Sequence, residues 1–221
     1  TLQVFFQKDR HVGSHGGGTE EGQREVLAGY GITEERLGVP VVTTVDTVYL
    51  GNCANGRPVW FDRAAYEADL IVPINRVKLH TDFVGPIQSG LCKMLVIGLG
   101  NHKGCSAVHE EAPEVFADAI EETARLILQK APVGFGIAIL ENAYDKTYAV
   151  EAVPAEHLVE REKELVQIAK GNMPYIMLDE ADVIVCGAIG KDISGAGFDP
   201  NILGRSSVLK QFVLHIPRYQ R

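Results

Sequence analysis

The stretch that decides the fold is LIVPINRVKLHTDFVGPIQSGLCKMLVIGLGNHKGCSAVH, residues 70–109. Residues 70–77 are apolar and β-branched, which is typical of a strand buried on both faces of a parallel sheet. A glycine-rich loop follows, and the run around Lys93 predicts a short apolar helix. Residues 80–109 hold three histidines and two lysines among glycines. Neither a core nor a solvated loop usually carries that mixture, so the stretch indicates a functional site.

On either side of this stretch, helical and strand-like patterns alternate. Apolar residues at helical spacing predict helices, and alternating or continuous β-branched runs predict strands. The predicted helices are 19–32, 63–69, 114–130 and 155–171, and the predicted strands are 41–51, 57–61, 133–140, 147–153 and 181–190. A turn at residues 52–56 joins two of these strands. A second glycine loop is expected after the Lys93 helix, which puts His109 at the opening of a helix.

This order of elements predicts an α/β fold, with a Rossmann-like, largely parallel sheet and flanking helices. We expect an N-terminal α/β domain at 1–153, a connecting helix at 154–172 and the start of a second α/β domain at 173–221.

Composition narrows the class of protein. The chain has 221 residues, 46% of them hydrophobic, and a net charge of −8, so it lacks the broad basic surface that nucleic-acid binding needs. Its four cysteines form no CxxC pair, which favours reduced thiols over disulfides or a structural zinc site. No apolar run reaches membrane length and no signal peptide is apparent. We expect a soluble, cytoplasmic protein with no nucleic-acid or membrane partner.

Three glycine-rich loops are predicted at strand ends, where ligands collect in α/β folds. They are HVGSHGGGTEE at 11–21, KLHTDFVGPIQSG at 78–90 and GKDISGAGFDP at 190–200. Glycine permits close backbone approach to a ligand, although it is also the commonest turn residue. The first two loops also carry histidine, and this coincidence favours a site.

Each candidate side chain has a plain alternative. His15 could cap a helix or lie in solvent, and His80 could be a core histidine with its hydrogen bonds satisfied. Lys93 could extend its amine to the surface, or it could be partly buried and nucleophilic. His109 could be a surface residue in a first helical turn. The residues alone leave these alternatives open, and the case rests on the set.

Three of these features resemble the nickel-pincer lactate racemase family and its 2-hydroxyacid racemase and epimerase relatives. They are GSHGGGTEEGQ at 13–23, HTDFVGPIQSGLCKM at 80–94 and the sixteen-residue separation of Lys93 from His109. The motif IGKDISGAGFDPNILGR at 189–205 resembles a poorly characterised branch of that family. Compared with family members, the chain is expected to be truncated at both ends.

The resemblance implies a cofactor and residues that hold it. The family's cofactor is the nickel-pincer nucleotide (nickel-pyridinium-3-thioamide-5-thiocarboxylic acid mononucleotide), joined through a thioamide to a lysine that Lys93 matches. His109 matches a histidine that completes the nickel coordination. Gly16, Gly17 and Gly90 are expected to line the cofactor, so domain 1–153 would be the cofactor-binding domain. Cofactor-biosynthesis proteins are the implied protein partners.

The resemblance also implies a reaction. His15 and His80 match two histidines that act as acid and base on opposite sides of the substrate, a role for which the ordinary imidazole pKa is suited. The implied chemistry is racemisation or epimerisation of a 2-hydroxyacid by hydride transfer through a 2-keto intermediate. Arg76 and Lys78 precede His80 at alternate positions, so they could share its side of a strand and bind the substrate carboxylate. Solvated cations at a strand end are the alternative.

Two other functions stay open at this point. Lys93 could form a Schiff base with a carbonyl substrate. The chain could also be a non-catalytic module in which the glycine loops bind a nucleotide or phosphate and the histidines are incidental.

Overall fold

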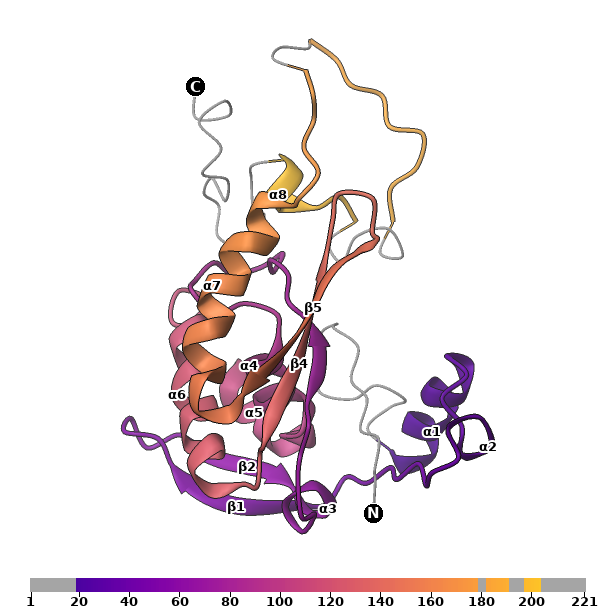
Figure 1. Cartoon of the computed structure of the whole chain (residues 1–221). Coiled ribbons are helices and arrows are strands. Elements are labelled where there is room, and N and C mark those ends of the chain that lie inside the picture. Colours follow the sequence, from indigo (N-terminus) through magenta and orange to yellow (C-terminus); the bar gives the residue numbers. More distant parts are fainter. Residues whose placement is uncertain (1–18, 179–181, 191–196, 204–221) are drawn as a thin grey trace.

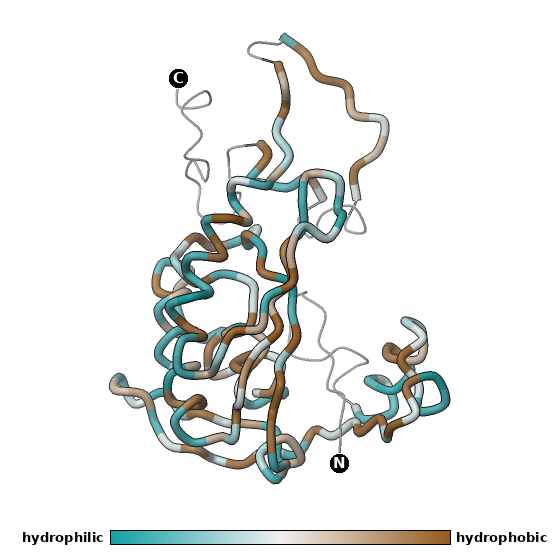
Figure 2. The backbone as a smooth tube through the Cα atoms, viewed as in Figure 1, coloured by the Kyte–Doolittle hydropathy of each residue, from teal (hydrophilic) through white to brown (hydrophobic). Residues whose placement is uncertain are grey.

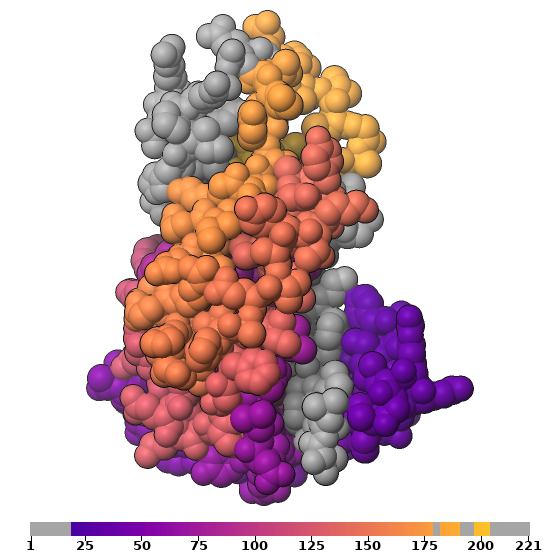
Figure 3. Space-filling model, in the orientation of Figure 1, coloured from indigo at the N-terminus to yellow at the C-terminus, as the bar shows by residue number. Residues whose placement is uncertain are grey.

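The computed structural model describes residues 19–178, 182–190 and 197–203. In chain order, the elements are α1 (Glu20–Gly29), α2 (Glu34–Leu37), β1 (Thr47–Asn52), β2 (Pro58–Asp62), α3 (Arg63–Tyr66), β3 (Ile74–Arg76), α4 (Leu91–Lys93), the π-helix η2 (Met94–Gly98), α5 (Asn101–His109), α6 (Phe116–Lys130), β4 (Phe135–Glu141), β5 (Thr147–Pro154), the 3₁₀-helix η3 (Ala155–His157), α7 (Leu158–Gly171) and α8 (Pro200–Leu203). Figure 1 shows α6 and α7 beside the strands β4 and β5, with α1 and α2 to one side of this body. In Figure 3 the same two N-terminal helices, in indigo, form a lobe at the side of the surface.

The strands form two small sheets, so the mixed α/β class is confirmed. Strands β1 and β2 pair antiparallel, while in the sheet β3–β4–β5 the first pair is parallel and the second antiparallel. The predicted Rossmann-like, largely parallel sheet is therefore wrong for the part of the chain described here. The cause is the length of the connections. Turns of a few residues join β1 to β2 and β4 to β5, and a parallel pair needs a crossover of a dozen residues or more.

Several local predictions are confirmed. Helix α1 begins after Thr19, whose hydroxyl accepts a hydrogen bond from the backbone N–H of Gly22 at 3.1 Å. The short helix α3, the long helix α6 and the strands β2, β4 and β5 lie where the sequence predicts them, to within a few residues at their ends. The predicted hairpin is also present, but β1 begins at Thr47, six residues after the predicted start of its strand.

One strand prediction is confirmed in its position but not in its burial, and another is wrong. Within residues 70–77, Ile74–Arg76 pair parallel with β4 and Ile71 bridges Val133, but Ile74 is 53% exposed, so the strand is not buried on both faces. Residues 182–190 form no strand, and Val183 and Val185 are 78% and 89% exposed. This apolar segment runs along the large upper loop of Figure 2, where it is coloured mostly brown. A β-branched run predicts a buried strand only if a sheet edge lies within reach, and none pairs with these residues.

The core lies between the sheet β3–β4–β5 and the helices. Strand β4 alternates, so Ala138 and Leu140 point inward, and α7 packs on β4, β5, α4 and α6. Leu158 and Leu165 of α7 belong to the same buried cluster as residues from β2 onward. The helix predicted to connect two domains is therefore part of this core. The boundaries at 153 and 172 stay a prediction.

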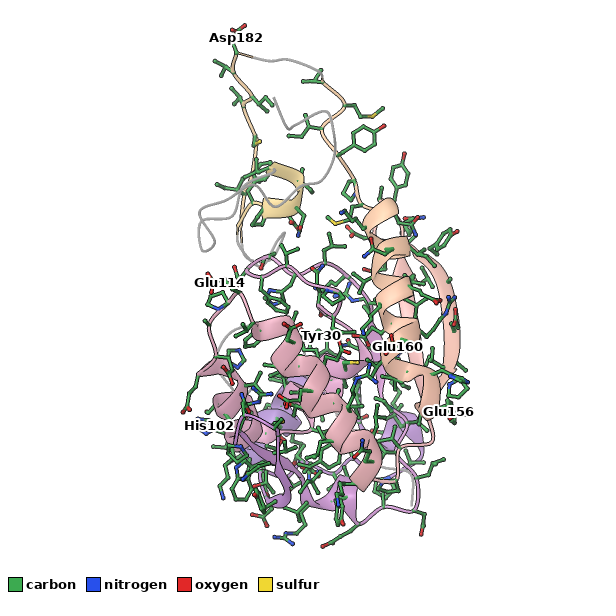
Figure 4. All side chains as sticks on the ribbon, turned by 90° about the vertical axis from the view of Figure 1, so that its left-hand side faces the viewer. Tyr30, His102, Glu114, Glu156, Glu160 and Asp182 are labelled. Carbon is green, nitrogen blue, oxygen red and sulfur yellow. The ribbon has the colours of Figure 1, made fainter. Side chains whose placement is uncertain are left out.

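Ion pairs on the outer surface tie α6 to α7. Glu121 of α6 accepts hydrogen bonds from Arg125 at 2.8 Å and from Lys163 of α7 at 2.8 Å, and Arg125 also pairs with Glu160. Figure 4 labels Glu160 on the outer side of α7. Glu162, two residues further along the same helix, is fully buried. Helix α7 thus carries one carboxyl group into the core, and it lies close to the candidate site.

A buried arginine fixes the hairpin to α6. The Arg57 guanidinium donates to Glu111 at 2.5 Å and to Glu122 at 2.7 Å, and it also reaches the carbonyl oxygen of Ala119 at 3.3 Å. Arg57 is itself buried, so these carboxylates compensate for the loss of its hydration. None of the described helices is long and apolar enough to span a lipid bilayer.

Candidate functional site

Lys93 stands at an irregular point of the backbone. Helix α4 passes at Lys93 directly into the π-helix η2, whose wide turn is closed by a hydrogen bond from the N–H of Leu99 to the carbonyl oxygen of Met94 at 2.9 Å. Its neighbours Cys92 and Met94 are buried, whereas Lys93 is half-buried. The predicted short apolar helix around Lys93 is confirmed. Single turns of π-helix occur frequently at functional sites.

The loop 78–90 returns to the end of β3 before the Lys93 helix begins. Lys78 and Ser89 exchange two backbone hydrogen bonds, at 2.9 and 3.2 Å. The side-chain amide of Asn75 donates to the carbonyl oxygen of Gly90 at 2.9 Å. The strand end and the turn before Lys93 are therefore held together, which brings Lys78 close to the start of α4.

A buried carboxyl group closes the same turn from the other side. The N–H of Cys92 donates to Oε2 of Glu162 at 2.8 Å. A Cβ placed on Gly90 would lie 2.7 Å from the carboxyl carbon of Glu162, so this glycine is needed for close packing. Burial raises the pKa of Glu162 to about 7, and the N–H groups of Cys92 and Leu91 offset this only in part. Burial and the neighbouring Glu162 raise the pKa of the Cys92 thiol well above its usual range, so this cysteine is inert.

Glu162 is a site residue that the sequence interpretation missed. Its signal is the helical period of α7, where Leu158, Leu165 and Ala169 form one apolar face and Glu162 stands among them. A carboxyl group on the buried stripe of a helix is rare unless it has a partner.

His80 is half-buried and fixed by its neighbours. Its ring stacks on Phe83, with centroids 4.3 Å apart, and its Nδ1 accepts the backbone N–H of Asp82 at 3.0 Å. The backbone N–H of His80 donates to Oε1 of Gln88 at 2.8 Å, and the side-chain amide of Asn201 donates to the backbone carbonyl oxygen of His80 at 2.9 Å. Because Nδ1 accepts, the neutral ring carries its proton on Nε2.

His109 has the opposite tautomer. Its Nδ1 lies 2.8 Å from the carbonyl oxygen of Cys105, and because a carbonyl can only accept, Nδ1 carries the proton and Nε2 keeps its lone pair. The ring is exposed and meets Phe116 edge-on at 5.0 Å. The prediction that His109 opens a helix is wrong, since it is the last residue of α5. The glycines before His109 were interpreted as a loop, but Gly104 lies inside α5, where a Cβ would come within 2.9 Å of the carbonyl oxygen of Trp60.

Two phenylalanines connect the histidines. Phe83, stacked on His80, lies 4.9 Å from Phe116, which in turn contacts His109. Both phenylalanines are buried. The structure thus joins His80 and His109 to one aromatic cluster, although nearly thirty residues separate them in the sequence.

Comparison with known proteins shows what this chain is similar to. Residues 11–118 match the family model described as the lactate racemase N-terminal domain. The chain is lactate racemase-like.

The fold is also similar to that of a solved structure. The chain resembles the structure of the lactate racemase apoprotein from Thermoanaerobacterium thermosaccharolyticum, with a TM-score of 0.52 and 16% sequence identity. The likeness covers 64% of this chain and 37% of that chain, so the lactate racemase-like chain corresponds to little more than a third of the length of its structural relative. No curated protein sequence matches it significantly.

The remaining predicted residues of the lactate racemase-like domain are partly placed. Nη1 of Arg76 pairs with both carboxylate oxygens of Glu141, at 2.9 and 3.0 Å. The backbone stays extended as far as Lys78, because the N–H of Val77 bonds to the carbonyl oxygen of Ile139 at 2.8 Å. Arg76 and Lys78 therefore point to the same side, and binding of a substrate by either stays a prediction.

Three predicted residues, His15, Gly16 and Gly17, lie outside the described residues. Among residues 19–178, 182–190 and 197–203, no group of three or more histidine, cysteine or acidic side chains could hold a metal ion. Within that part of the chain, His109 is the metal ligand that the sequence predicts, and the assignment of Lys93, His80, His109 and Gly90 to the site stays a prediction.

Proposed function

We propose that this chain is a racemase or epimerase of a 2-hydroxyacid that depends on the nickel-pincer nucleotide. The observation that carries the proposal is the combination, in a lactate racemase N-terminal domain, of a half-buried Lys93 at a π-helix and a His109 whose Nε2 is kept free for a ligand. The cofactor-biosynthesis proteins, the 2-hydroxyacid and the cytoplasmic location remain part of the proposal.

The residues that the structure describes fit this cofactor. Lys93 would be the point of covalent attachment. His109 would bind nickel through Nε2, because imidazole is a good nickel ligand and metal-bound histidines usually donate their other N–H to a carbonyl or carboxylate. The Cys105 carbonyl oxygen provides that acceptor at 2.8 Å. When bound, the cofactor supplies hydride-acceptor chemistry, which no protein side chain offers.

His80 and His15 would act as the acid and the base of the reaction. To take the hydroxyl proton of a substrate at Nε2, His80 must carry its own proton on Nδ1, and this requires the contact from the Asp82 N–H to open. Substrate binding is therefore expected to move residues 81–84. His15 would serve the opposite face of the substrate, since inversion needs one base for each enantiomer.

The carboxylate of the substrate would bind the cations at the end of β3. Arg76 uses Nη1 for Glu141, and the other N–H groups of its guanidinium remain suited to a second carboxylate. Lys78 lies beside the turn that leads to Lys93. Both positions support a binding site next to the attachment lysine.

The test is intact mass and nickel analysis of four variants produced together with the cofactor-making enzymes. Lys93→Ala should carry no adduct, and His109→Ala should carry the adduct but lose most of its nickel. His80→Ala and His15→Ala should keep both and lose turnover by a factor of about 10²–10⁴. An adduct on Lys93→Ala together with unchanged nickel in His109→Ala would refute the proposal. An adduct that appears only after borohydride treatment with a carbonyl substrate would favour the Schiff-base function instead.

A further inference from the structure

A buried acid on the helix α7 lies directly behind the turn that carries Lys93. Glu162 is fully buried, and no described cation compensates for it, in contrast to Arg57 with its two glutamates. Its Oε2 accepts the N–H of Cys92, and its Oε1 has no hydrogen-bond partner among the described residues. Burial of a carboxyl group in this way costs free energy, so a specific task for it is a reasonable expectation.

The carboxyl group replaces a helix cap that the sequence lacks. Helix α4 begins after Gly90, which has no side chain with which to cap it, and the first N–H groups of a helix have no partner inside the helix. Oε2 of Glu162 accepts the N–H of Cys92 from another helix, and the nearby N–H of Leu91 also acts to lower the pKa of the carboxyl group. The space for its carboxyl group exists only because residue 90 has no Cβ.

The backbone before Lys93 is thereby fixed from two sides. On one side, Asn75 and the Lys78–Ser89 bridge hold it to the end of β3. On the other side, Glu162 holds it to α7, which is packed into the core. A side chain that must meet a cofactor in a defined geometry benefits from such support, because errors of about 1 Å reduce the efficiency of a site.

We propose that Glu162 is a positioning residue that holds the Gly90–Lys93 turn so that Lys93 meets its reaction partner. The inference rests on the proposed function, in which Lys93 is the attachment point. The positioning role depends on the reach of the carboxyl group to the N–H of Cys92, and it does not depend on the charge of the group.

Two conservative substitutions distinguish the effect of the length of the Glu162 side chain from the effect of its charge. Glu162→Gln keeps an acceptor oxygen at the same distance and loses the acid. Glu162→Asp keeps the acid, but its carboxyl group is withdrawn by one methylene, about 1.5 Å. Glu164→Gln, at an exposed position two residues along the same helix, is the matched control.

Three properties are measured on each full-length variant. They are the hydrogen exchange of the Leu91 and Cys92 amides, the acetylation rate of Lys93 by acetic anhydride relative to the exposed Lys130, and the adduct on Lys93 after production with the cofactor-making enzymes. In Glu162→Asp we expect exchange about tenfold faster, as the loss of one buried hydrogen bond gives, together with a changed acetylation ratio and a reduced adduct. Glu162→Gln and Glu164→Gln should match the wild type in all three.

The outcomes distinguish this inference from the proposed function. Wild-type exchange and acetylation in Glu162→Asp, or the same losses in Glu162→Gln as in Glu162→Asp, would overturn the positioning role. A wild-type protein without adduct would overturn the proposed function. In that case exchange and acetylation, which need no cofactor, still decide whether Glu162 positions Lys93.

Discussion

Replacement of Glu162 by glutamine should change how the stability of this protein depends on pH. In the folded protein burial raises the pKa of Glu162 from 4.5 to about 7. A raised pKa means that the folded state binds the proton more tightly than the unfolded chain does. The stabilisation by the protonated group is therefore complete below about pH 4.5 and is lost as the pH rises to about 7.

The magnitude follows from the size of the shift. A shift from 4.5 to about 7 corresponds to about 3 kcal/mol, at roughly 1.4 kcal/mol for each pH unit. A glutamine at position 162 is uncharged at every pH, so the Glu162→Gln variant lacks this pH-dependent contribution to the free energy of unfolding. The free energy of unfolding of the wild type, minus that of Glu162→Gln, should fall by about 3 kcal/mol over this range and stay level above it.

Urea denaturation at intervals between pH 4.5 and pH 8 measures this difference directly. Other titrating groups occur in both proteins and cancel in the subtraction. Glu164→Gln, which makes the same substitution at an exposed position of the same helix, is the control. A level difference for Glu162→Gln as well would show that the carboxyl group is hydrated in the folded protein, and it would refute the burial on which the reasoning depends.

Three further predictions concern other parts of the molecule. Arg57→Ala leaves two glutamates without their buried cation and should lower the free energy of unfolding by about 2–4 kcal/mol, whereas the exposed Arg63→Ala should change it by less than about 0.5 kcal/mol in the same denaturation assay. Gly90→Ala forces a Cβ to within 2.7 Å of the Glu162 carboxyl group and should cost about 1–3 kcal/mol. Combination with Glu162→Gln should leave this cost unchanged, because the amide is equally large. Arg76→Ala should raise KM for a carboxylate substrate well above its effect on an uncharged analogue, and equal effects on both would exclude Arg76 from carboxylate binding.

Local signals in the sequence predicted the elements that local chemistry determines. Thr19 caps α1 as expected, and the turn at residues 52–56 gives the hairpin β1–β2. The pairing of strands depends on partners far apart in the sequence, and here the prediction failed. Residues 70–77 were predicted to form a strand buried on both faces, yet Ile74 in β3 is exposed. Residues 182–190 were predicted to form a buried strand, yet they are exposed for almost their whole length and form no strand with any described residue.

Glycine was the least reliable signal of a loop or a ligand site, because glycine also occurs where close packing leaves no space for a Cβ. Around Gly104 it was interpreted as a loop, but it lies inside α5, where the carbonyl oxygen of Trp60 leaves no space for a Cβ. Gly90 was assigned to a cofactor, and the structure gives it a second reason in the carboxyl group of Glu162. Neither contact can be inferred from spacing, since each involves a segment distant in the sequence.

The two histidines show why a site cannot be read from residue types alone. The motif makes His80 and His109 equivalent candidates, and both join the aromatic cluster of Phe83 and Phe116. Backbone contacts then distinguish them. The Asp82 N–H makes Nδ1 of His80 an acceptor, and the Cys105 carbonyl oxygen makes Nδ1 of His109 a donor. His109 therefore presents a lone pair, as a metal ligand must, whereas His80 presents an N–H and would have to change its contacts before it could act as a base. If the proposed roles hold, the backbone around each ring is what distinguishes the ligand from the acid–base residue.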